Sequence, residues 1–194
     1  LPILVNEVAR VPEMQRLACE LASAARDAAG AQGGGVAIAG CIPPLNGTYR
    51  PDRVRSFATN HEEYMRLAEL QAPHVDLFIC ETMSTAEEAR AAAAAVASFG
   101  KPVWVGWTLA DHLPRLRSGE HISTAAAGLQ GIGVTAVLAN CSLPETITAA
   151  MPEFVETGYA CGGYANGFTH IPQSFLPGKT LRSEEHTSEL QSRQ

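Results

Sequence analysis

Side chains that could do chemistry stand at the ends of short apolar runs in this sequence. They are one thiol, one carboxylate and two amides, namely Cys141, Glu81, Asn140 and Asn166. Short apolar runs of this kind are typical of strands buried on both faces of a parallel sheet. The carboxyl ends of such strands lie on one face of an α/β fold, where ligands bind. We therefore expect these four side chains to lie at one mouth.

The residue types at this mouth limit the chemistry. No predicted strand end carries a histidine, which argues against histidine-based acid–base catalysis and against a paired cysteine nucleophile. The thiol of Cys141 can pack, attack or bind a soft metal. The carboxylate of Glu81 ends a buried strand, so it must be solvated, paired or functional. Each residue also has a structural explanation, because cysteine is often buried and Asn140 and Asn166 can hold a loop or turn.

Five strands and five helices are predicted to position these groups. The strands are expected at 36–39, 75–80, 102–109, 136–141 and 159–164. Amphipathic or alanine-rich helices are expected at 10–30, 60–71, 84–98, 122–129 and 142–158. Asn60 is expected to cap the second helix, and Ser84 with Glu87 to form a capping box at the third. Alternating strands and helices predict parallel βαβ units, in an open doubly wound sheet or in a piece of an eight-stranded barrel.

The composition is typical of a single soluble domain. The chain has 194 residues, of which 46% are hydrophobic and 18% charged. A net charge of -6 argues against nucleic acid or an anionic membrane as a partner. We expect no transmembrane helix and no signal peptide, and the odd, widely spaced set of five cysteines predicts reduced thiols in the cytoplasm. No glycine-rich nucleotide motif follows a strand.

Four runs, in their order and spacing, resemble the homocysteine S-methyltransferase family. They are Ala-Gly-Cys-Ile-Pro-Pro at 39–44, Val-Asp-Leu-Phe-Ile-Cys-Glu-Thr at 75–82, Ala-Asn-Cys-Ser-Leu-Pro at 139–144 and Gly-Tyr-Ala-Asn-Gly at 163–167. The resemblance implies an α/β fold, a partial TIM (β/α)8 barrel with about five parallel strands corresponding to family strands three to seven. It also implies methyl transfer from a small onium-type donor to the zinc-bound thiolate of homocysteine, which forms methionine.

The resemblance also implies roles for individual residues. Cys141 falls on the first of three cysteine ligands of a catalytic zinc, and the adjacent pair that supplies the other two is absent from this sequence. Glu81 matches the carboxylate that holds the substrate ammonium group, and Asn140 and Asn166 line the same mouth. Cys41 stands where the family usually has serine. Because one thiolate cannot hold a catalytic zinc, we expect the chain as written to be inactive. Because strands three to seven alone would leave two edges and part of the core exposed, we also expect it to be poorly stable.

The last residues differ in kind from the rest. Residues 182–192 resemble the conceptual translation of a sequencing-library adapter, so we expect a partial barrel at 1–181 and a non-native, disordered tail at 182–194. Two other functions stay open. One is a metal-independent α/β-barrel lyase that uses Glu81 and Asn140, and the other is a non-enzymatic α/β binding module. Among methyl donors, S-methylmethionine, S-adenosylmethionine and betaine are all onium compounds.

Overall fold

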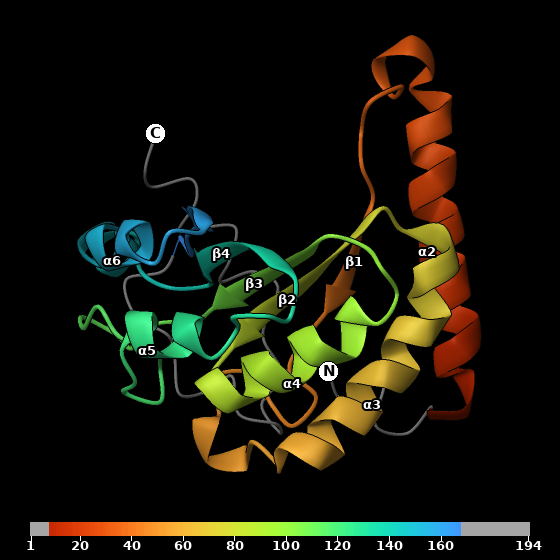
Figure 1. Cartoon of the computed structure of the whole chain (residues 1–194). Helices are drawn as coiled ribbons and strands as arrows, with labels where there is room; N and C mark the ends of the chain where they lie inside the picture. Colours follow the sequence, from red (N-terminus) through yellow and green to blue (C-terminus); the bar gives the residue numbers. More distant parts are fainter. Residues whose placement is uncertain (1–7, 168–194) are drawn as a thin grey trace, which may run out of the picture.

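A single parallel sheet forms the centre of the computed structural model, which describes residues 8–167 (Figure 1). Its strands are β1 (Ala39–Ile42), β2 (Leu77–Met83), β3 (Val103–Trp107), β4 (Val134–Asn140) and β5 (Ala160–Tyr164). Each strand pairs in parallel with its neighbour in sequence, in the order β1-β2-β3-β4-β5. A doubly wound sheet reverses its strand order at a switch point. The observed order has no reversal, so the described sheet is of the barrel type. Of the two predicted alternatives, the piece of an eight-stranded barrel is therefore the one observed.

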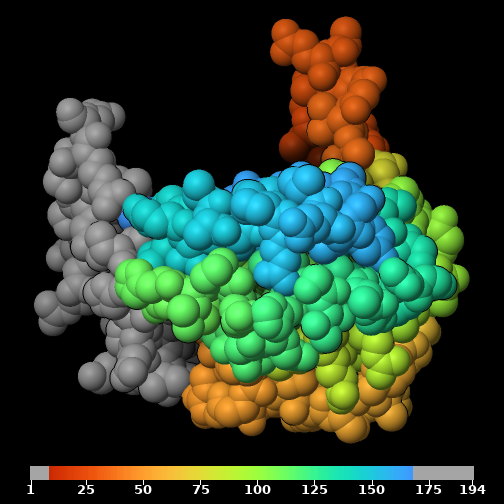
Figure 2. All heavy atoms as spheres, turned by 60° about the vertical axis from the view of Figure 1, so that its left-hand side comes forward, coloured from red at the N-terminus to blue at the C-terminus, as the bar shows by residue number. Residues whose placement is uncertain are grey.

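The α-helices of the described chain are α2 (Val11–Ala28), α3 (Phe57–Gln71), α4 (Ala86–Ala97), α5 (Ile122–Ala127) and α6 (Pro144–Glu156). The last four each follow a strand, whereas α2 precedes β1 and packs on α3. Short 3-10 turns stand at Val8–Arg10, Gly30–Gln32, Pro51–Arg53 and Ala72–His74. One end of α2 projects clear of the other elements (Figures 1 and 2), and Leu21 on this helix is 71% exposed. The tail predicted at 182–194 lies outside the described residues.

The first strand lies three residues later than predicted. Val36 was expected within it, yet this residue is 56% exposed and precedes β1. The ladder to β2 begins with the pair Ala39–Leu77 and ends with Ile42–Cys80, so hydrogen bonding to β2 sets the strand rather than the local apolar pattern. As a result Cys41 lies inside β1, near its carboxyl end.

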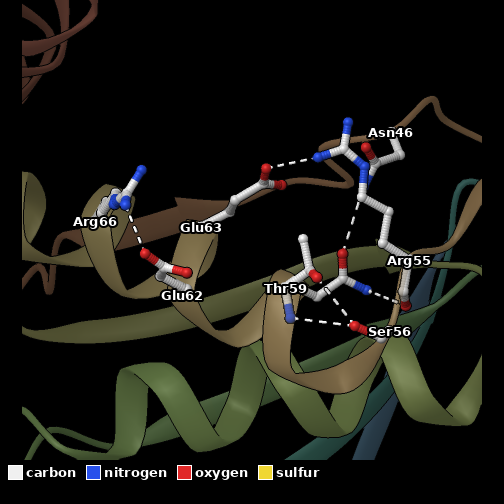
Figure 3. Close-up of polar contacts among 8 residues, drawn as sticks. Asn46, Arg55, Ser56, Thr59, Glu62, Glu63 and Arg66 are labelled. Carbon is white, nitrogen blue, oxygen red and sulfur yellow. Dashed lines mark hydrogen bonds and ion pairs between the residues drawn. The ribbon is translucent and has the colours of Figure 1, made fainter.

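The start of α3 also differs from the prediction. The helix begins at Phe57, and its N-cap is Ser56, whose hydroxyl accepts a hydrogen bond from the Thr59 N–H at 3.4 Å (Figure 3). Asn60 is not the cap: it is buried within the first turn, where its side-chain amide donates to the Arg55 carbonyl at 3.0 Å. Arg55 in turn pairs with Glu63 at 2.6 Å, which ties the preceding loop to the helix.

The capping box of α4 is shifted by one residue. Thr85 is the N-cap and accepts from the Glu88 N–H at 3.0 Å, while Glu88 accepts from the Ser84 N–H at 2.8 Å. The predicted box began at Ser84 and used Glu87. The reason is tertiary, because Glu88 is only 2% exposed and its other oxygen accepts from the Tyr64 hydroxyl at 3.4 Å.

The hydrophobic core lies between the sheet and its helices. Trp107 from β3 and Phe154 from α6 are fully buried, with ring centroids 6.3 Å apart. Five of the eight alanines of α4 are buried as well, and their small side chains let this helix lie close to the sheet. Within residues 8–167, no helix is both long and apolar enough to cross a membrane.

Candidate functional site

The carboxylate of Glu81 joins three strands at their carboxyl ends. One of its oxygens accepts a hydrogen bond from the Cys41 thiol of β1, with 2.7 Å between sulfur and oxygen. The other accepts from the Tyr164 hydroxyl of β5 at 2.9 Å. Since β3 and β4 lie between β2 and β5 in the sheet, this second bond shows that the sheet curls round enough for its strand ends to face one another.

Asn140 forms the second part of the site. Its side-chain oxygen accepts from the Thr82 N–H at 3.0 Å, and its side-chain nitrogen donates to the Thr82 hydroxyl at 2.8 Å. The same nitrogen lies 3.4 Å from the Cys141 sulfur, and the Thr82 hydroxyl lies 3.5 Å from it. Asn140 is fully buried. Two polar groups are thus directed at the sulfur of Cys141, and the amide of Asn140 holds both strand ends in place.

The glycine of β3 makes room for this amide. A Cβ on Gly106 would lie 3.1 Å from the side-chain oxygen of Asn140, closer than most real Cβ contacts. Asn140 can therefore cross from β4 to the end of β2 because β3 has no side chain at this position.

The backbone at the site adopts unusual conformations. Thr82, the penultimate residue of β2, and Cys141, which directly follows β4, both have positive φ angles, of 62° and 49°. Left-handed conformations are uncommon for residues with a Cβ, and for a β-branched residue such as threonine they are a genuine outlier. Both residues are held by the hydrogen bonds of Asn140. Strain of this kind gathers at functional sites, where the surrounding structure fixes it.

The loop after β1 contributes Tyr49. Its φ is also positive, at 62°, and the guanidinium of Arg117 lies over its ring, 5.1 Å from the centroid. Arg117 is fixed in turn by Asp111 at 2.6 Å. Burial raises the pKa of Tyr49, with a further rise from Cys141, whereas a hydrogen bond with Asn166 and the charge of Arg117 lower it. Tyr49 therefore lies between the Cys141 sulfur and Asn166.

Asn166 reaches the site from the segment after β5. Its backbone N–H donates to the Ser142 carbonyl at 2.9 Å, and the N–H of Cys141 donates to the Tyr164 carbonyl at 3.1 Å. These bonds hold the end of β5 beside the turn that carries Cys141. The structure thus brings together all four predicted site residues, and Asn140 lies beneath the surface of the site rather than at its mouth.

The thiol and phenol that flank Glu81 are held in their neutral forms. Burial, followed by the hydrogen bond to Glu81 and by its charge, raises the pKa of Cys41 to about 12. Burial and the same carboxylate raise the pKa of Tyr164. Among residues 8–167, no lysine, arginine or histidine forms an ion pair with Glu81. The two neutral donors therefore orient the carboxylate without neutralising its negative charge.

A zinc ion would need more ligands than the described chain offers. Catalytic zinc takes three protein ligands and leaves one position for substrate. Between residues 8 and 167, no group of three histidine, cysteine or carboxylate side chains is arranged to hold a metal. Cys141 is half-buried and its sulfur is within reach of polar donors, so it could serve as one ligand. The described residues alone do not fit a complete catalytic zinc site.

Comparison with solved structures supports the barrel assignment. Three crystal structures of the homocysteine methyltransferase MmuM from Escherichia coli resemble this chain. The apo form has a TM-score of 0.65 and 22% identity over 83% of this chain and 70% of that one. The metallated form has a TM-score of 0.67 and 24% identity over 81% of this chain and 67% of that one. The oxidized form has a TM-score of 0.65 and 20% identity over 94% of this chain and 71% of that one. No curated protein sequence matches the chain significantly.

Fold and strand-end site together define an α/β-barrel enzyme. The sequence model of the homocysteine S-methyltransferases matches residues 5–193. The chain therefore belongs to the homocysteine S-methyltransferase family. This match confirms the resemblance seen in the sequence.

Sequence reasoning missed part of this site. From the sequence, Cys41 had no role beyond standing where the family usually has serine, and neither Tyr49 nor Thr82 was singled out. The signal for Cys41 was its position just after the predicted strand at 36–39, where it was one of several side chains near the strand ends. Thr82 shares its strand end with Glu81, but the left-handed backbone of Thr82 and Tyr49 could not be predicted from residue type.

Proposed function

We propose that this chain binds homocysteine at the carboxyl ends of its strands, with Glu81 holding the substrate's ammonium group. The observation that supports this most is the state of the Glu81 carboxylate. It receives hydrogen bonds from two neutral donors, lies partly exposed, and has no cationic partner among the described residues. A partly buried anion in this state is favourably placed for a cationic ligand, because a charge-assisted hydrogen bond is about twice as strong as a neutral one.

The reaction we propose for the complete protein, rather than for this chain by itself, is methyl transfer to the sulfur of homocysteine. The thiol proton leaves to water, and the sulfur electron pair attacks the methyl carbon of an onium donor. As the new sulfur–carbon bond forms, the bond from the methyl group to the donor heteroatom breaks. Its electron pair stays on the donor, which becomes neutral, and methionine is released. With homocysteine anchored by Glu81, the sulfur would be directed toward the strand end that carries Cys141.

We also propose that Cys141 is a zinc ligand in the complete protein. Its sulfur lies near the Asn140 amide and the Thr82 hydroxyl, and such polar partners orient a ligand thiolate. A metallated form of E. coli MmuM, which shares this fold, is in keeping with the proposal. Because the described residues do not complete the ligand set, we assign no step of the reaction to the metal. Asn140 would then act by positioning, and Asn166 would line the mouth.

The remaining features agree with a small-molecule enzyme of the cytoplasm. All five cysteines are free, and the net charge of -6 does not favour nucleic acid or an anionic membrane. Homocysteine and a small methyl donor are the partners we propose. Family membership favours methyl transfer over the metal-independent lyase and over the non-enzymatic binding module.

A binding experiment tests the role of Glu81. Isothermal titration calorimetry would compare homocysteine with 4-mercaptobutyrate, which has the same thiol and carboxylate but no ammonium group. The variant Glu81→Gln keeps the shape and removes the charge. It is expected to weaken homocysteine at least about tenfold, since 1.4 kcal/mol corresponds to that factor, and to leave 4-mercaptobutyrate nearly unchanged. Equal affinity of wild type and Glu81→Gln for homocysteine would overturn the proposal.

Two further measurements address the metal and the activity. Titration of the purified chain with Zn²⁺ is expected to show no tight stoichiometric binding, and assay with each of the three onium donors no methionine. Tight binding that Cys141→Ser abolishes, or methionine formed from any donor, would contradict the expectation that this chain is inactive by itself.

A further inference from the structure

The carboxylate of Glu81 would attract a cationic ligand without any neighbour, so the hydrogen bonds that it accepts from Cys41 and Tyr164 need an explanation of their own. We infer that Cys41 and Tyr164 are positioning residues, which hold the Glu81 carboxylate in the orientation that receives an ammonium group. This inference rests on the proposed function, because it assigns a role to the neighbours of the proposed anchor. It starts from two distances, 2.7 Å from the Cys41 sulfur and 2.9 Å from the Tyr164 oxygen, each to a different oxygen of Glu81.

The hydrogen-bonding capacity of the carboxylate leaves room for the ligand. An ionised carboxylate has about four lone-pair positions, two on each oxygen. Cys41 uses one on the first oxygen and Tyr164 uses one on the second. One position on each oxygen is left for an ammonium group, which has three N–H donors. The two neighbours thus fix both oxygens without filling the carboxylate.

The charge of these donors matters as much as their geometry. A lysine or arginine at either position would also orient Glu81, yet it would neutralise the carboxylate and compete with the ligand. A thiol and a phenol orient it without doing so, provided that they stay protonated. The pKa of Cys41 is raised to about 12, and a phenol with its ordinary pKa of about 10 is protonated as well, so both are donors at physiological pH.

Packing does not account for the two side chains. Cys41 is exposed and Tyr164 is 42% exposed, so neither belongs to the hydrophobic core, although surrounding protein atoms partly desolvate the thiol and the phenol. They stand on β1 and β5, the two outer strands of the described sheet, and both donate to the carboxylate on β2. Their polar atoms therefore converge on Glu81 from opposite sides, which restricts rotation of its side chain. An unrestrained glutamate would lose rotamer freedom when the ligand binds.

The ammonium group gives a selective test of this role. Cys41→Ala and Tyr164→Phe each remove one donor and are expected to weaken homocysteine about three- to tenfold by calorimetry. Binding of 4-mercaptobutyrate is expected to stay within about twofold, because that ligand has no ammonium group. Cys41→Ser should restore most of the homocysteine affinity, since a hydroxyl also donates. Cys161→Ala, which removes a thiol of β5 packed against the core, is the matched control and should bind both ligands as the wild type does.

A second readout does not depend on homocysteine. The rate at which iodoacetamide alkylates Cys41 at pH 8, measured by peptide mass spectrometry, reports how strongly the thiol proton is held, because the thiolate is the reactive form. Glu81→Gln removes the negative charge that favours the thiol and is expected to speed alkylation of Cys41 several-fold. Alkylation of Cys161 serves as the internal reference.

The outcomes separate this inference from the proposed function. Unchanged alkylation of Cys41 in Glu81→Gln would overturn the thiol–carboxylate bond. Equal weakening of both ligands by Cys41→Ala, or no weakening of either, would overturn the positioning role while Glu81 could still bind the ammonium group. A wild-type chain that binds neither ligand would overturn the proposed function and the positioning role with it. Selective loss of homocysteine, restored by Cys41→Ser, supports both.

Discussion

Asn140 and Thr82, 58 residues apart in sequence, are joined by two hydrogen bonds that pass across β3. The amide of Asn140 meets the N–H of Thr82 at 3.0 Å and its hydroxyl at 2.8 Å. It thereby stabilises the left-handed backbone of Thr82 and approaches the sulfur of the next residue, Cys141. One buried side chain thus connects the strand end next to Glu81 with the strand end that carries the thiol.

The first prediction concerns the removal of this amide. Asn140→Ala leaves the buried N–H of Thr82 without its partner, and an unsatisfied buried donor costs about 1–3 kcal/mol. We expect the free energy of unfolding, measured with urea, to fall by about that amount. Thr148→Ala removes a local hydroxyl contact on the exposed face of α6 and should change it by less than about 0.5 kcal/mol. Equal losses in the two variants would argue against a special role for Asn140.

The second prediction concerns the space above β3. Gly106→Ala places a Cβ 3.1 Å from the side-chain oxygen of Asn140, so the amide must shift or the strand must move. We expect a loss of about 1–3 kcal/mol in urea unfolding, as for other overpacked sites. Gly162→Ala in β5 is the matched control, because its Cβ would meet a leucine methyl at an ordinary 3.6 Å. A tolerated Gly106→Ala would contradict the crowding inferred at this point.

The third prediction concerns pH and the buried carboxylate of Glu88. Burial raises the pKa of Glu88, although hydrogen bonds from the Ser84 N–H and the Tyr64 hydroxyl oppose the shift. A carboxyl group with a raised pKa in the folded state binds its proton more tightly there than in the unfolded chain. Its contribution to stability is therefore complete below the ordinary pKa of glutamate, about 4.3, and is lost as pH rises through the folded-state value.

Glu88→Gln removes this dependence. We expect its free energy of unfolding, relative to wild type, to improve in urea titrations as pH rises from about 4 through the folded-state pKa of Glu88, and to level off above it. Glu62→Gln, at an exposed ion pair with Arg66 on α3, controls for the loss of one carboxylate. If both variants gave the same trend with pH, burial of Glu88 would not be its cause.

The fourth prediction compares two adjacent residues of α6. Phe154 is fully buried and packs on Trp107, whereas Val155 is 63% exposed. Phe154→Ala is expected to cost about 3–5 kcal/mol, since it removes a large core side chain and leaves a cavity. Val155→Ala is expected to cost less than about 0.5 kcal/mol. Urea unfolding followed by tryptophan fluorescence measures both, and similar costs would contradict the packing of α6.

Much of the fold was readable from local patterns. The five strands and five helices were predicted because apolar runs and helical periodicity are properties of neighbouring residues. Their ends were less predictable: β1 lies at Ala39–Ile42 and α3 starts at Phe57 because sheet pairing and the Ser56 cap, rather than propensity, set these bounds. Likewise Glu88, and not Glu87, completes the cap of α4 because its side chain is drawn into the core.

The sequence by itself determined which chemical groups stand at the strand ends, because Glu81, Asn140 and Cys141 follow their apolar runs directly along the chain. Tertiary structure alone decided which of them meet. Cys41 and Tyr164 reach Glu81 from 40 and 83 residues away, and only a sheet that curls in an unreversed strand order brings those ends together. For the same reason Asn140 is a buried brace between strands, because its neighbours in space are set by the curvature of the sheet and not by its neighbours in sequence.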